Sequence, residues 1–284
     1  MIYFMNLSLI IVPFTDCILP PFTSKVTKTL FYHLFDGKSV FDRRMFSFSP
    51  LYRNGRPLYK VLKSRRDFKN ISIKVSRNER LSAKISLIIR DKILLPKPEV
   101  EFKFNEYKFY AHIVNIEVDD ISSISIDLPD IFRINFITPT LIPVPGRGKF
   151  LQKLGIKRRY RLFPDLSLIL MLLTYDLQLQ KISLTNISPV KIFKWAYKAI
   201  AELDYNIRPE TILYTVKDNK PSVERGFTGY TVYQILDKKY LEEVKKLLGY
   251  GLKMGIGKSR TIGFGQITIK KEKINHLNTT NHKS

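Results

Sequence analysis

The sequence of 284 residues contains a single cysteine, Cys17, and only four histidines. One cysteine excludes disulfide frameworks within the chain, zinc sites built on several thiolates, and CxxC redox chemistry. The sequence also has no HxxxH pair and no DxD turn, so we expect chemistry without a metal ion or a cofactor. A reducing, intracellular setting is the default for such a chain, and we expect a cytoplasmic protein.

Long apolar runs are also missing. The first nineteen residues are rich in apolar side chains, but they lack a basic start and contain Asn6, Pro13 and Asp16, so they predict a buried strand rather than a signal peptide. The apolar run at 166–173 is too short to span a bilayer and is typical of a core helix. We therefore expect no membrane anchor.

Acidic residues are scarce. The chain has 25 acidic residues against 48 basic ones, a formal charge of +23, which indicates a polyanionic partner, with nucleic acid favoured over a membrane surface. Apolar residues make up 44% of the chain, enough for a proper core in each of two domains of ordinary size.

Glycine is concentrated in one segment, 249–271, GYGLKMGIGKSRTIGFGQITIKK, which holds six glycines between a helical pattern and a strand pattern. Because glycine has no Cβ atom, the backbone amides of such a segment can approach an oxyanion closely, and nearby cations strengthen the binding of that anion. A turn that only closes the domain is the alternative. The Walker spacing is absent because position 252 is Leu252, which favours an extended phosphodiester over a nucleotide. The candidate RNA-binding residues here are Gly255, Gly257, Lys258, Ser259, Arg260, Gly263 and Gly265.

A second basic segment, 145–161, PGRGKFLQKLGIKRRYR, carries seven positive side chains and no acid. Such a loop is suited to phosphate contacts, which supply affinity without sequence choice. Its candidate RNA-binding residues are Arg147, Lys149, Lys157, Arg158 and Arg159.

The periodicity predicts an α+β protein. The first elements are a strand over 2–12 and a helix over 22–35, capped by Thr23 or Ser24, with Val26, Leu30 and Leu34 on its buried face. Further expected elements are a hairpin at Asn54-Gly55, a short helix within 91–104, helices from Leu166, over 189–203 and over 238–252, and strands over 81–89, 107–118, 131–141 and 225–236 and after the glycine-rich segment.

The order strand, helix, strand, strand, helix, strand fits the second half and, more loosely, the first. We therefore expect two tandem ferredoxin-like (RRM-like) domains, over 1–124 and 125–273. The polar run 274–284 is expected to be a disordered tail.

Four segments together resemble the CRISPR repeat-processing endoribonucleases, the sixth Cas family: PFTSKVTKTL, RINFITPTLIP, RGFTGYTVYQI and GIGKSRTIGFGQI. The resemblance implies that a cleft between the two domains binds CRISPR repeat RNA. It also implies metal-independent cleavage by the 2′-hydroxyl, leaving a 5′-hydroxyl and a 2′,3′-cyclic phosphate. Homodimer formation and hand-over of the product to a CRISPR interference complex are further expectations.

Most members of that family carry a catalytic histidine in or just after the first helix, where this chain offers only His33. Its spacing from Val26 and Leu30 predicts a position nearer the buried stripe than the basic face. The closest resemblance is to an archaeal branch that uses cations instead, and the matching residues are Lys25, Lys28, Arg44, Arg225 and Arg260.

These cations suit the chemistry. Arginine stays charged and can stabilise a phosphorane, whereas crowding by Lys25 would lower the pKa of Lys28 and let it transfer a proton. A solvated helix face for the two lysines, and plain strand-end charges for Arg44 and Arg225, are the alternatives. Two other functions stay open: a non-catalytic RNA-binding subunit of an interference complex, and a basic structural or DNA-binding protein.

Overall fold

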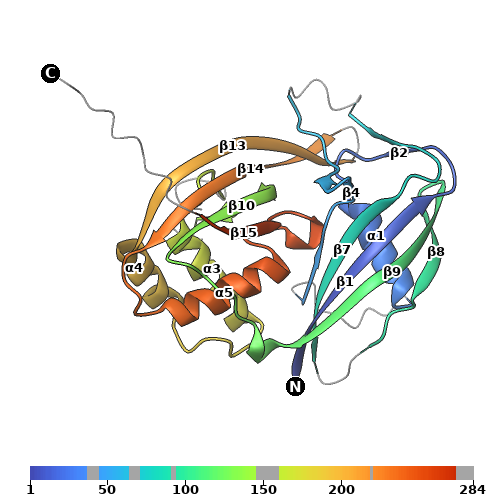
Figure 1. Ribbon diagram of the computed structural model, residues 1–284. Helices are drawn as coiled ribbons and strands as arrows, with labels where there is room; N and C mark the ends of the chain where they lie inside the picture. The colour runs from blue at the N-terminus through green and yellow to red at the C-terminus, as the bar shows by residue number, and fades with distance from the viewer. Residues whose placement is uncertain (37–44, 64–70, 91–93, 145–159, 218–219, 273–284) are drawn as a thin grey trace.

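The computed structural model describes residues 1–36, 45–63, 71–90, 94–144, 160–217 and 220–272. Figure 1 shows two lobes, each built on its own antiparallel sheet, with the first half of the chain on the right and the second half on the left. This is the expected α+β architecture of two ferredoxin-like units.

The sheet of the first lobe is centred on β1 (Ile2–Pro13), the strand predicted at the start of the chain. β1 pairs antiparallel with β7 (Leu81–Arg90) on one side and with β9 (Tyr107–Asp120) on the other. The sheet order is β5-β4-β7-β1-β9-β8, and β3 also pairs with β7. The shorter strands are β2 (Cys17–Leu19), β3 (Phe46–Phe48), β4 (Tyr52–Arg53), β5 (Arg56–Pro57), β6 (Ile73–Val75) and β8 (Glu99–Phe104).

Helix α1 (Ser24–Leu34) packs on this sheet through the predicted apolar stripe, since Val26, Leu30 and Leu34 are buried. The predicted side-chain cap is wrong. The hydroxyl of Thr23 instead donates to the carbonyl of Leu58 at 2.8 Å and accepts from the amide of Leu51 at 2.9 Å, so it fixes the start of α1 to the following strands.

Two other expectations about the first lobe have different outcomes. The hairpin at Asn54-Gly55 is confirmed, with both residues at positive φ (50° and 74°) between β4 and β5, as a type I′ turn requires. The short helix expected within 91–104 is wrong for the described part of that range, 94–104, because Glu99–Phe104 forms the edge strand β8. The alternation of buried and exposed side chains favours a strand here, because Phe102 and Phe104 are buried and their neighbours are exposed.

The second lobe has the sheet order β13-β14-β10-β15. Taking the strands in chain order, this is 2-3-1-4, the arrangement of a ferredoxin-like unit, as predicted. The strands are β10 (Ile131–Thr140), β13 (Ile200–Lys217), β14 (Lys220–Ile235) and β15 (Ile267–Lys271), with a small ladder of β11 (Ile142–Pro143) and β12 (Tyr160–Arg161).

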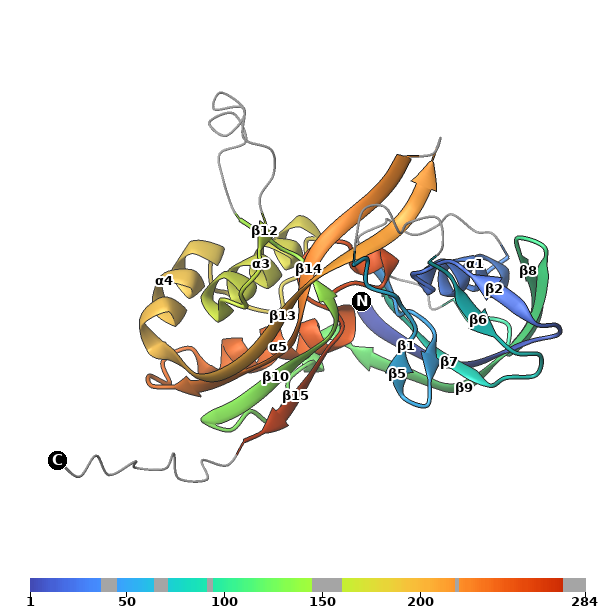
Figure 2. The same ribbon diagram turned by 90° about the horizontal axis from the view of Figure 1, so that it is seen from above.

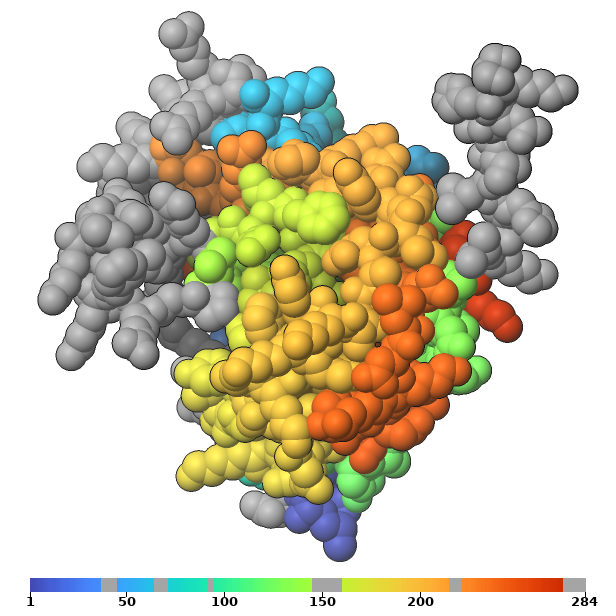
Figure 3. All heavy atoms as spheres, turned by 90° about the vertical axis from the view of Figure 1, so that its left-hand side faces the viewer, coloured from blue at the N-terminus to red at the C-terminus, as the bar shows by residue number. Residues whose placement is uncertain are grey.

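Three helices cover one face of this sheet: α3 (Leu166–Leu179), α4 (Pro189–Ala199) and α5 (Leu241–Met254). Figure 3 looks onto the helical side, where α4 and α5 share the surface. The helix predicted over 189–203 is too long, because the chain leaves α4 at Ala199 and enters β13. β13, with 18 residues, and β14, with 16, form one long hairpin.

That hairpin reaches the first lobe, as Figure 2 shows from above. The amide of Leu62 donates to the carbonyl of Thr211 at 2.8 Å, and the hydroxyl of Tyr59 donates to Glu210 at 3.0 Å. Beneath these contacts lies a small core shared by both lobes, formed by Phe22, Leu141, Ile212 and Phe264. The start of α1 therefore sits at the junction of the two lobes.

Candidate active site at the junction of the two lobes

The glycine-rich loop, residues 255–266, joins α5 to β15 and folds tightly on itself. A Cβ atom at Gly257 would lie 2.3 Å from the carbonyl oxygen of Leu141, and one at Gly265 would lie 2.0 Å from that of Ile256. Both glycines also have positive φ, 77° and 74°, which other residues rarely adopt. Packing of the loop thus requires glycine at these positions.

The loop amides largely serve the same packing. The amides of Ile256, Lys258, Ile262, Gly263 and Gly265 donate to the carbonyls of Gly265, Leu141, Ser259, Arg260 and Pro139 respectively. Amides held in this way do not form an open anion cradle, so the domain-closing alternative accounts for much of the glycine pattern. A contact between RNA and Gly255, Gly257, Gly263 or Gly265 stays a prediction.

The loop lies directly against the start of α1. The hydroxyl of Ser24 donates to the carbonyl of Ile262 at 2.6 Å. A Cβ atom at Gly263 would lie 2.8 Å from the Cβ of Ser24 and 3.1 Å from the ring of Phe22. The structure therefore brings together the two regions that the sequence singled out, although 238 positions separate Ser24 from Ile262.

Lys25 projects from α1 towards the hairpin of the second lobe. Its Nζ lies 4.8 Å from the centre of the Tyr214 ring on β13, close enough for a cation–π contact. Burial, and then the positive charge of Lys28, lower the pKa of Lys25. These surroundings single out Lys25, which the sequence treated as the neighbour of the reactive lysine. Lys28 lies one turn further along α1 and is partly buried.

Arg260 is held inside the protein. Its guanidinium lies 2.6 Å from the Asp176 carboxylate, with 11% of the Arg260 side chain exposed, and its Nη1 lies 3.5 Å from the hydroxyl of Tyr250. Because so little of the side chain is exposed and its charge is paired with Asp176, the guanidinium offers little surface to a phosphate. The expected role of Arg260 in charge stabilisation stays a prediction that this geometry does not favour.

Two other cations lie on the second lobe near the junction. The Nζ of Lys258 donates to the hydroxyl of Tyr160 at 2.7 Å, and Ser259 begins the next turn at φ 68°. Arg225 is exposed on β14 opposite Thr211. The strand rise places Thr211 about 10 Å along β13 from Tyr214, the residue that contacts Lys25. Arg225 therefore belongs to the β13–β14 hairpin, which contacts Lys25 of α1.

His33 is exposed on the last turn of α1, with its ring 6.0 Å from that of Phe102. The contact with the buried Phe102 puts its ring on the side of α1 that packs against β8, although the imidazole itself is exposed. The helix rise puts His33 about 12 Å along α1 from Lys25, away from the glycine-rich loop.

Several candidates lie outside the described residues. Arg44 is one of them, and so is the basic segment that holds Arg147, Lys149, Lys157, Arg158 and Arg159. Among the sites that the structure shows, sequence reasoning missed Asp176, Tyr250 and Tyr214. The one available signal was an acid, Asp176, in the otherwise apolar run of α3, since a carboxylate there calls for a cationic partner.

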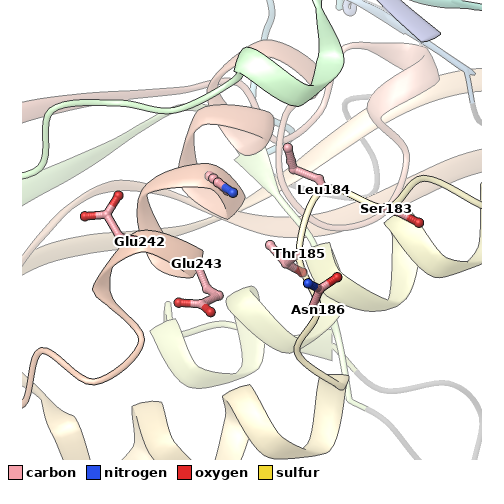
Figure 4. A pocket seen from close by; sticks show the side chains of 7 residues that line it. Ser183, Leu184, Thr185, Asn186, Glu242 and Glu243 are labelled. Atoms are coloured by element: carbon pink, nitrogen blue, oxygen red, sulfur yellow. The ribbon is translucent and has the colours of Figure 1, made fainter. Parts of the chain in front are cut away.

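The hollow shown in Figure 4 lies elsewhere in the second lobe. Its seven lining residues are Ser183, Leu184, Thr185, Asn186, Glu242, Glu243 and Lys246. Glu242 and Gly255 lie at opposite ends of α5, so the hollow is about 20 Å from the glycine-rich loop. Its two glutamates make it a poor match for a phosphate.

In the parts of the chain that the structure describes, no three His, Cys, Asp or Glu side chains are grouped as a metal ion would require. Within those same parts, no helix has the length and apolar character to cross a bilayer.

Known proteins resemble this chain along nearly its whole length. In Saccharolobus solfataricus, CRISPR-associated endoribonuclease Cas6 1 is 27% identical over 94% of this chain and 96% of its own, and CRISPR-associated endoribonuclease Cas6 2 is 25% identical over 93% and 95%. Among solved structures, a Cas6 product complex has a TM-score of 0.59 at 13% identity, and a Cas6-related protein from Pyrococcus furiosus 0.53 at 14%; each match covers 95% of this chain and 100% of the other. The structural likeness supports the fold of two ferredoxin-like units.

Two family models match the sequence. The Cas6 N-terminal domain matches residues 5–119, and the CRISPR-associated endoribonuclease Cas6 model matches residues 134–267. Since the two matches together take in most of the chain and follow one another in the family's order, the protein belongs to the CRISPR-associated endoribonuclease Cas6 family.

Proposed function

We propose that this RNA-cleaving enzyme cuts CRISPR precursor RNA within its repeats, without a metal ion, by attack of the 2′-hydroxyl on the adjacent phosphate. The products would carry a 5′-hydroxyl and a 2′,3′-cyclic phosphate. The observation that carries the proposal is the position of Lys25, partly buried with a lowered pKa where α1, the β13–β14 hairpin and the glycine-rich loop meet.

The reaction needs in-line geometry, loss of the 2′-hydroxyl proton, stabilisation of charge on the phosphorane, and protonation of the departing 5′-oxygen. A new bond forms between the 2′-oxygen and phosphorus as the bond from phosphorus to the 5′-oxygen breaks. Lys25 is suited to give its proton to the 5′-oxygen, because an ammonium group in partly buried surroundings is a stronger acid than one in water.

The 2′-hydroxyl proton passes to solvent, and stabilisation of the phosphorane goes to neighbouring cations. Lys28, one turn from Lys25, and Arg225, on the hairpin that Lys25 contacts, supply positive charge for the phosphorane. Arg44 keeps the same predicted role. Because no imidazole with a pKa near neutrality takes part, we expect a rate below that of a well-placed histidine, whose contribution is about 10²- to 10⁴-fold.

RNA binding is proposed to follow the charge. Lys258 and the basic segment over 145–161 would contact phosphates, which makes affinity depend strongly on salt, while unstacked bases would supply sequence choice. Homodimer formation and hand-over of the product to an interference complex stay predictions.

One assay tests the proposal against its two rivals. Purified protein is incubated in EDTA with a CRISPR repeat RNA, and beside it with the same RNA carrying a single 2′-deoxyribose at the cut site. We expect cleavage at one position of the first RNA and none of the second. Tight binding without cleavage would instead indicate a non-catalytic subunit, and equal affinity for RNA and duplex DNA would indicate a basic DNA-binding protein.

A further inference from the structure

A cluster of four polar side chains, Asp176, Gln180, Tyr250 and Arg260, lies beneath the glycine-rich loop. Asp176 Oδ2 accepts three hydrogen bonds, from the hydroxyl of Tyr250 at 2.5 Å, from Arg260 Nη2 at 2.6 Å and from Gln180 Nε2 at 2.8 Å. Gln180 Nε2 also lies 2.9 Å from the hydroxyl of Tyr250. One carboxylate therefore joins α3, α5 and the loop.

The charges in the cluster are fixed. Burial raises the pKa of Tyr250, so its phenol stays protonated and keeps donating to Asp176. Burial alone would lower the pKa of Arg260, but Tyr250 and Asp176 outweigh it and raise that pKa, so the guanidinium stays charged. A partly buried charge of this kind is costly without its partner. Loss of the Asp176 carboxylate would thus release the Arg260 side chain.

Arg260 in turn fixes the loop. Its Cγ lies 3.4 Å from the place where a Cβ would stand on Gly255, and its carbonyl accepts a hydrogen bond of 3.3 Å from Ser47 in the first lobe. The cluster has a second link to that lobe, because the guanidinium of Arg90 donates to the carbonyl of Gln180. The side chain of Arg260 therefore contacts α3 and α5 of the second lobe, and its backbone contacts β3 of the first lobe.

We infer that Asp176 and Tyr250 are positioning residues for RNA cleavage: through Arg260 they hold the glycine-rich loop against α1 and so set the place of Lys25. The inference rests on the proposed function and deepens it. It gives Arg260 a structural task in place of a phosphate contact. The two roles predict different effects of Arg260→Met on RNA affinity, because loss of a phosphate contact would weaken binding, whereas loss of a structural task would lower the cleavage rate.

The experiment uses the full chain with Asp176→Asn, Tyr250→Phe, Arg260→Met and the double variant Asp176→Asn with Arg260→Met. Two quantities are measured: the single-turnover cleavage rate at saturating protein, and the Kd for the uncleavable 2′-deoxy repeat RNA. We expect Asp176→Asn to lower the rate by about 10- to 100-fold and Tyr250→Phe by less, with Kd changed no more than about twofold. The double variant should be no slower than Arg260→Met alone, since residues that act through one another are not additive.

Asp119→Asn is the matched control. Asp119, on β9, pairs with Lys253 on the last turn of α5, so this change removes the same chemical group from an ion pair to a helix of the cluster, but outside the cluster itself. We expect an unchanged rate. If Asp176→Asn does not fold, Tyr250→Phe still tests the inference, because it deletes a single oxygen from the cluster.

Three results would overturn the inference. They are an unchanged rate in Tyr250→Phe and any folded Asp176→Asn, a loss confined to Kd, as expected if Arg260 touched the RNA itself, or rate losses that add in the double variant, as expected if Asp176 acted independently of Arg260. Failure of the wild-type protein to cut repeat RNA would instead contradict the proposed function. Failure of the inference can therefore be distinguished from failure of the proposed function.

Discussion

Ser24, the first residue of α1, donates its hydroxyl to the carbonyl oxygen of Ile262 in the glycine-rich loop, at 2.6 Å. Lys25 follows it directly in the helix. Because one hydrogen bond and the close packing of Gly263 join the loop to this turn, the position of Lys25 depends on the loop. In the proposed reaction, the glycine-rich segment would contribute to cleavage by placing a side chain of the other lobe.

Gly263→Ala tests that link. Gly263 has φ 89°, and an added methyl would meet Ser24, so we expect a loss of about 1–2 kcal/mol in unfolding free energy from the backbone strain and a lower single-turnover cleavage rate. Gly55→Ala is the control, because Gly55 has φ 74° with no atom within 4 Å of the added Cβ. It should lose similar stability in urea titrations and keep its cleavage rate. Equal rates for the two variants would remove the loop from the reaction.

Lys25→Ala should lower the single-turnover rate by about 10²-fold or more, the range for loss of a well-placed proton-transfer group. His33→Ala should cleave like the wild type, because His33 is exposed towards the other end of α1. Lys28→Ala should fall between the two. The measurement is the rate of product formation at saturating protein. Full activity in Lys25→Ala with a dead His33→Ala would reverse the assignment.

The pH dependence follows from the lowered pKa of Lys25, caused first by burial and then by Lys28. A proton donor acts in its protonated form, and a lowered pKa means that the proton is lost at a lower pH than in free lysine. The cleavage rate should therefore fall as the pH rises, with a midpoint below the ordinary lysine pKa of 10.5. Lys25→Arg, which stays charged, should lack this fall. A rate that climbs through the same range would indicate that Lys25 acts as a base.

The sequence pattern predicted correctly those elements whose structure depends on neighbouring residues in the chain. The spacing of Val26, Leu30 and Leu34 predicted the buried face of α1, and Asn54-Gly55 predicted its hairpin. The boundary between α4 and β13 was missed because Ala201, Glu202 and Leu203 suit a helix, whereas pairing of Ala201 and Glu202 with β14 draws the segment into a strand.

The candidate site shows the same division. Clustered glycines and cations identified the loop, but no local signal pairs Arg260 with Asp176, which lies 84 positions away and belongs to another element. A helical wheel gave Lys25 and Lys28 similar surroundings. Only the hairpin folding over from the second lobe, with Tyr214 beside Lys25, separates the two.

Lys258 offers a test of RNA binding that is independent of cleavage. If its ammonium, held by the hydroxyl of Tyr160 at 2.7 Å, contacts a phosphate, then Lys258→Met should reduce the slope of log Kd against log salt by about 0.7, the value for one contact with single-stranded nucleic acid. Lys245→Met is the control, since Lys245 pairs with Glu242 on the first turns of α5 at 2.8 Å and should leave the slope unchanged. Binding of 2′-deoxy repeat RNA is measured at several salt concentrations. Tyr160→Phe, which keeps the charge, should alter Kd but not the slope, and an unaltered slope in Lys258→Met would place the phosphates elsewhere.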